Sequence, residues 1–178
     1  MMRKVFGALA AVAALSASSV EASAQNPFVA GYTDIGPTVG LGGIGDAGLS
    51  LGGRFERGIK PLPSLGNGML GIMVSVEYYS WDNAFFKYTY MPIGVTANYH
   101  FNLEGNAKID PFIGLGLGYE VISCDYRGSG FDNLCDDSAI YFIGRAGARY
   151  FFSPRLAFYG DVGAGAATLN VGIMFKLR

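Results

Sequence analysis

Charged side chains recur at alternate positions of several apolar stretches of the chain, on the face opposite to the apolar residues. Successive side chains of a β-strand point to opposite faces, so these charges would meet inside a closed sheet. Charges brought together in this way must pair, because removing one partner of a buried pair costs about 3–5 kcal/mol. The residues assigned to this interior charge cluster are Arg54, Glu56, Glu77, Glu120, Arg145, Arg149, Asp161 and Lys176.

We expect this cluster to act as a charge-paired plug. A barrel of eight strands is barely wide enough to hold its own side chains, so paired charges would close its lumen. If a turn is centred on Ser153 and Pro154, Arg145 and Asp161 lie opposite one another and both point inward. The alternative interpretation is a narrow, gated ion path through the same charges.

The only histidine, His100, lies on the inward face near the end of an expected strand. No serine and acidic residue accompany it in a recognisable catalytic motif. We therefore expect a hydrogen-bonded lumen residue rather than a catalytic base.

Two cysteines, Cys124 and Cys135, flank a polar loop. A disulfide between them is expected in an exported protein, and it should stabilise the fold by about 2–3 kcal/mol. Two cysteines and one distant histidine do not make a zinc site, and the sequence predicts no metal and no other cofactor. The loop is acidic and could bind calcium weakly or engage an external partner, but its spacing matches no EF-hand. Its acidic residues, opposed only by Arg127, are Asp125, Asp132, Asp136 and Asp137.

The elements that would carry these residues are long strands with a period of two. In the segment 91–103 the odd positions are apolar and the even positions are small or polar, and the pattern restarts at 109–122. Such length suits a transmembrane barrel, with lipid outside and a crowded, glycine-rich interior. The expected strands are 35–43, 49–58, 69–79, 91–103, 109–122, 139–152, 155–163 and 167–177.

The first residues form a processing signal. Arg3 and Lys4 precede an apolar stretch, and 22–24 is a small-residue cleavage site, so we expect a cleaved signal peptide at 1–24 and one domain at 25–178. The formal net charge of −1 offers no basic surface for nucleic acid.

Aromatic residues gather in two bands that would lie at the two membrane interfaces. The band expected at the outer rim contains Tyr78, Tyr79, Trp81, Phe85, Phe86 and Tyr88. The band expected at the periplasmic rim contains Tyr99, Phe101, Tyr150, Phe151, Phe152 and Phe175.

Together with the strand pattern, the segments 110–119 (DPFIGLGLGY) and 169–175 (LNVGIMF) make the chain resemble the eight-stranded outer-membrane β-barrel superfamily, the OmpA/OmpX-like and opacity-type group. The resemblance covers nearly the whole mature chain. It implies an all-β, antiparallel, up-and-down transmembrane barrel in a Gram-negative outer membrane, a porin-like family, and a monomer in contact with lipid and lipopolysaccharide. The chain ends at Arg178, whereas many of these proteins end in an aromatic residue, and Phe175 is the nearest one.

Three functions remain open on the sequence. The favoured one is a non-enzymatic barrel with a structural, adhesion-like or surface-interaction role, with any external partner at the Cys124–Cys135 loop. A lipid A-modifying enzyme would need a reactive triad near the outer rim, which the sequence does not offer. A soluble, lipocalin-like barrel would invert the pattern and turn its apolar face inward to bind a ligand.

Overall fold

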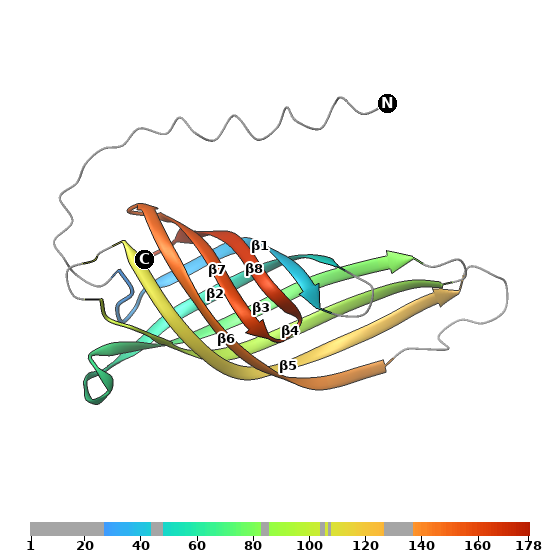
Figure 1. Cartoon of the computed structure of the whole chain (residues 1–178), viewed down its shortest axis with the longest axis horizontal. Coiled ribbons are helices and arrows are strands. Elements are labelled where there is room, and N and C mark those ends of the chain that lie inside the picture. The colour runs from blue at the N-terminus through green and yellow to red at the C-terminus, as the bar shows by residue number, and fades with distance from the viewer. Residues whose placement is uncertain (1–26, 44–47, 83–85, 104–105, 107, 127–136) are drawn as a thin grey trace, which may run out of the picture.

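The computed structural model is a closed barrel of antiparallel strands, in which neighbours in the chain are neighbours in the sheet and β1 pairs with β8 (Figure 1). The expected all-β, eight-stranded, up-and-down barrel is confirmed. The strands are β1 (Thr33–Gly43), β2 (Leu49–Leu62), β3 (Gly68–Asp82), β4 (Phe86–His100), β5 (Ile109–Tyr126), β6 (Asp137–Ser153), β7 (Leu156–Ala164) and β8 (Ala167–Lys176).

The structure describes residues 27–43, 48–82, 86–103, 106, 108–126 and 137–178. The expected signal peptide lies outside this range, as do Cys135 and most of the acidic loop. Within it, no helix has the length and apolar character needed to cross a membrane.

The apolar face of every strand points outward. Leu115 and Leu117 of β5 are 64% and 61% exposed, while Phe112 on the alternate face of the same strand is buried. This is the sense expected for a barrel in lipid and the opposite of a lipocalin, whose apolar face lines the cavity.

The strands differ from their expected bounds mostly by being longer. The connection 59–68 looks too long for a turn in the sequence, but β2 continues to Leu62 and is followed only by a short 3-10 helix, Pro63–Leu65. A break in register between Gly58 and Lys60 lets the β2–β3 hairpin extend beyond the barrel. The strand β4 ends earlier than expected, at His100 instead of Leu103.

Four described members of the expected aromatic bands are wrongly assigned to the lipid-facing surface, because Tyr79, Trp81, Tyr88 and Phe151 lie on inward positions of their strands. Tyr79 is fully buried and Phe151 is 8% exposed. Clustering of aromatic residues in the sequence does not show which face of the strand each one occupies. Tyr78, Phe101, Tyr150, Phe152 and Phe175 are exposed, as expected for interfacial residues.

The two ends of the barrel are different. At the terminal end, which carries the β2–β3, β4–β5 and β6–β7 turns, the barrel meets residues 27–32 and the C-terminus (Figure 1). At the opposite end, the loop end, β3 to β6 extend well past the other strands (Figure 1). In register, β2 accompanies β3 only as far as Tyr78, and β7 accompanies β6 only from Gly144 onward. We call the part of β3–β6 beyond these points the projecting sheet.

Candidate functional site

The interior at the terminal end is organised around the guanidinium group of Arg149, which is 1% exposed. Its Nε lies 3.0 Å from Asp34 Oδ2 and its Nη1 lies 3.0 Å from Asp110 Oδ2. Its Nη2 pairs with Glu56. One cation on β6 therefore joins carboxylates from β1, β2 and β5, and we call these residues with His100 the Arg149 cluster.

His100 connects two of these carboxylates. Its Nδ1 lies 2.9 Å from Asp110 Oδ1, and its Nε2 lies 2.8 Å from Glu56 Oε1. Ionised carboxylates only accept hydrogen bonds, so both contacts are satisfied together when both ring nitrogens carry protons. Such an imidazolium would leave the Arg149 cluster with three carboxylates against two cations. The predicted role of a hydrogen-bonded lumen residue agrees with this geometry.

Aromatic residues from the segment that precedes β1 close the Arg149 cluster from the terminal end. The ring of Phe28 stacks on His100 with centroids 3.5 Å apart and planes 10° apart. Tyr32, whose hydroxyl donates to Asp34 Oδ2 at 2.9 Å, is 1% exposed. Burial raises the pKa of Tyr32, so its phenol stays protonated and remains a donor. We call residues 27–32 the cover segment.

A glycine makes room for this arrangement. A Cβ at Gly71 would lie 2.5 Å from Glu56 Oε1 and 3.1 Å from His100 Nε2. The inward face of β3 therefore needs a residue without a side chain where the Arg149 cluster and the cover segment meet.

A second cluster fills the middle of the barrel around Asp161, which is 2% exposed. Arg54 Nη1 lies 2.6 Å from Asp161 Oδ2, and the Arg145 guanidinium pairs with Asp161 Oδ1. Asn170 donates to the same Oδ1 at 2.9 Å. Arg54 also reaches Glu77 Oε1 at 3.4 Å, so the Asp161 cluster contains two arginines and two carboxylates.

Arg145 and Asp161 are ion-paired, but the expected register between them is wrong. Asp161 is opposite Gly147, and Arg145 is opposite Gly163. The turn falls at 154–155, between the paired residues Ser153 and Leu156, and not at Ser153 and Pro154. The pairing of β6 with β7 is therefore shifted from the expected register. The long arginine side chain spans the difference and also donates from Nη1 to the carbonyl of Ala167 at 2.6 Å.

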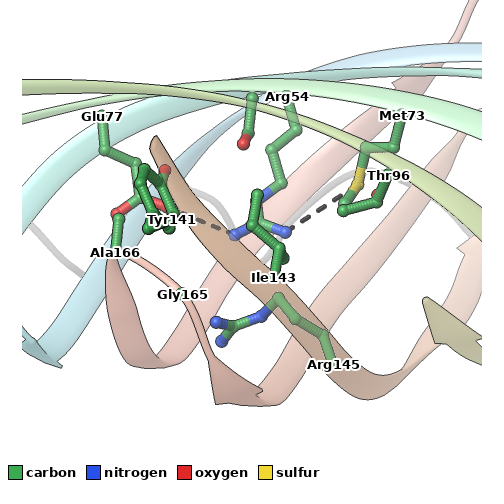
Figure 2. Close-up of a pocket in the computed structure, with 10 residues that line it drawn as sticks. Arg54, Met73, Glu77, Thr96, Tyr141, Ile143, Arg145, Gly165 and Ala166 are labelled. Carbon is green, nitrogen blue, oxygen red and sulfur yellow. Dashed lines mark hydrogen bonds and ion pairs between the residues drawn. The ribbon is translucent and has the colours of Figure 1, made fainter. Parts of the chain in front are cut away.

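A small pocket lies between the Asp161 cluster and the loop end (Figure 2). Its lining includes Arg54, Thr96, Tyr141, Ile143 and Arg145. Arg54 Nε and Thr96 Oγ1 are buried and have no hydrogen-bond partner in the described part of the chain. The pocket is close to the size of one water molecule, and a water there would satisfy such atoms.

The predicted interior residues do not all belong to these clusters. Arg54, Glu56, Glu77, Arg145, Arg149 and Asp161 are buried and ion-paired. Glu120 is half-buried near the loop end, and Lys176 is half-buried with its Nζ 5.2 Å from the centre of the Tyr32 ring. Cys124 is buried on β5, but the expected disulfide and the acidic loop involve residues outside the described range and stay predictions.

Sequence reasoning missed two carboxylates and the cover segment. Asp110 shares the alternation of Glu120 on the same strand, so its inward position could have been read from the pattern. Asp34 was missed because the first strand was expected to begin at Ile35, whereas it begins at Thr33. Phe28 and Tyr32 precede the strand and show no periodicity that would indicate burial.

The barrel is similar to solved structures of outer-membrane proteins. OprG from Pseudomonas aeruginosa superposes with a TM-score of 0.57 at 13% identity, over 86% of this chain and 99% of that chain. Ail of Yersinia pestis, in complex with the heparin analogue sucrose octasulfate, gives 0.53 at 13% identity over 82% and 93%. The N-terminal barrel domain of P. aeruginosa OprF gives 0.51 at 13% identity over 83% and 98%.

The chain has the fold of the eight-stranded outer-membrane β-barrels. Identities this low show the fold alone. No family model and no curated protein matches the sequence. In this barrel, the one histidine is fully buried between the carboxylates of Glu56 and Asp110.

Proposed function

We propose that the protein is a small, non-enzymatic barrel of the bacterial outer membrane, with a plugged interior and a structural or surface-interaction role. The observation that carries the proposal is the pair of buried clusters, in which Arg149 and Asp161 each bind partners from several strands across the lumen. Side chains held in this way occupy the space that a solute would need.

The outer surface supports the location. Large apolar side chains cover the outside of β5 from Ile109, which is 37% exposed, through Leu115, which is 64% exposed, to Val121. A soluble protein would not leave such a band uncovered, whereas lipid covers it in a membrane. We expect any surface role to belong to the loop end, where the projecting sheet extends past the other strands.

Single-channel recording tests the plug. The refolded protein in a planar bilayer should give no stable conductance, because the Arg149 and Asp161 clusters lie in series along the lumen. The double variant Arg54→Ala with Arg145→Ala should also give no stable conductance, because the Arg149 cluster still closes the lumen in series with the altered cluster. A stable ohmic current through the unaltered protein would contradict the plug and favour the gated ion path.

A further inference from the structure

The inner face of the projecting sheet is lined with aromatic rings. Tyr79 and Trp81 of β3 are opposite Tyr90 and Tyr88 of β4 and continue the inward alternation of the barrel. The Trp81 ring has its centroid 5.0 Å from that of Tyr88, with planes 16° apart, and 4.9 Å from that of Tyr90. These rings form a continuous wall above the lumen.

The wall continues to β6 and has a closed floor. Tyr141 packs with Trp81 and Tyr90 against a buried group made by Tyr79, Ala166 and Ala167. A Cβ at Gly118 would lie 2.1 Å from the Tyr141 ring, so the absence of a side chain there lets the ring lie over β5. The Tyr79 hydroxyl is 2.6 Å from the carbonyl oxygen of Ala166, which ties the floor to the β7–β8 turn.

Two carboxylates share this face. Ile122 and Asp137 are opposite each other and in register with Tyr90, and Glu120 is one inward position lower on β5. Glu120 is half-buried, and within the described residues neither Glu120 nor Asp137 takes part in an ion pair. The inner face of the described projecting sheet carries no basic residue.

The cations of the Asp161 cluster, which lies next to this face toward the middle of the barrel, are already paired with other carboxylates. Arg54 is paired with Asp161 and Glu77, and Arg145 is paired with Asp161. The inner face of the projecting sheet therefore combines negative charge with a group of aromatic rings. Aromatic rings attract cations through their quadrupole, most strongly at tryptophan, and the attraction grows where water is excluded.

We propose that the aromatic wall, together with Glu120 and Asp137, binds a small organic cation such as a quaternary ammonium ion. An inorganic cation prefers a shell of oxygen ligands, which rings cannot supply. An alkylammonium group fits both parts of the site, because its methyl groups contact the rings while its charge is balanced by the carboxylates. This inference is independent of the plug, since the site lies above it.

The sequence supplies a reporter in the site itself, because Trp81 is the only tryptophan in the chain. Detergent-solubilised full-length barrel, at fixed ionic strength, should be titrated with choline and separately with its uncharged isostere 3,3-dimethylbutan-1-ol. Choline should change the tryptophan fluorescence saturably, and the alcohol should not. An equal response to both would reveal an apolar site and overturn the proposal, as would the absence of a saturable response to choline.

Two variants test the carboxylate. Glu120→Gln removes the charge with little change of shape and should weaken choline binding about tenfold. Asp82→Asn is the matched control, because strand alternation places Asp82 on the outer face of the same strand as Trp81. Both variants should keep the circular dichroism of the folded barrel. If folded Glu120→Gln binds choline as well as Asp82→Asn does, the proposal is wrong.

Discussion

Arg149 is the side chain whose loss the barrel should tolerate least. Its guanidinium forms ion pairs with Asp34, Glu56 and Asp110, each on a different strand. Replacing it leaves three buried carboxylates close together, of which His100 contacts only Glu56 and Asp110. Burial of an uncompensated charge is far more costly than loss of a surface ion pair.

We predict that Arg149→Met lowers the free energy of unfolding by about 3–5 kcal/mol. The measurement is urea unfolding in detergent micelles, followed by circular dichroism. Arg155→Met makes the same chemical change at the exposed β6–β7 turn and should have little effect. Similar losses for the two variants would mean that the Arg149 cluster does not hold the wall together.

Alternation along the strands is enough to predict which way most interior residues point, but not which of them meet. Arg54 and Asp161 are separated by 107 positions, and their contact depends on the closure of the sheet. Arg145 illustrates the limit. The assumed position of the β6–β7 turn places Asp161 opposite Arg145, whereas the residue opposite Arg145 is Gly163, two positions further along β7. Side-chain length then decides the pairing, and sequence periodicity does not carry that information.

At the scale of elements, the cover segment is the part of the fold that sequence patterns conceal. It follows no strand or helix period, yet Phe28 is fully buried against His100. It is fixed to β2 by two backbone hydrogen bonds, from Gly31 to the carbonyl of Gly58 and from Gly58 to the carbonyl of Tyr32, each 2.9 Å long. The stretch before the first strand therefore belongs to the core.

We predict that Phe28→Ala destabilises the barrel by about 3–5 kcal/mol, as expected when a buried aromatic side chain is removed. The loss should appear in the same urea unfolding experiment. Val29→Ala is the matched control, since Val29 is the adjacent residue and is 42% exposed. Equal and small effects would show that the cover segment is not part of the cooperative unit.

At the scale of the whole molecule, the proposed location in the outer membrane can be tested directly. The continuous hydrogen-bonded wall and the interior clusters should make the folded barrel resistant to unfolding by detergent at room temperature. We predict that the protein recovered from the outer-membrane fraction changes its electrophoretic mobility after boiling in detergent. Recovery in a soluble fraction, with the same mobility before and after boiling, would contradict a membrane barrel.

The wall is not equally continuous around its circumference. The ladder between β4 and β5 runs without a break from Phe86 to His100, whereas the ladder between β1 and β8 skips Gly36, Pro37 and Gly42. Pro37 has no amide hydrogen to contribute to a ladder. Local openings of a protein begin where its hydrogen bonds are fewest. This seam joins the two ends of the chain and is interrupted within its ladder, so we expect it to close last during assembly.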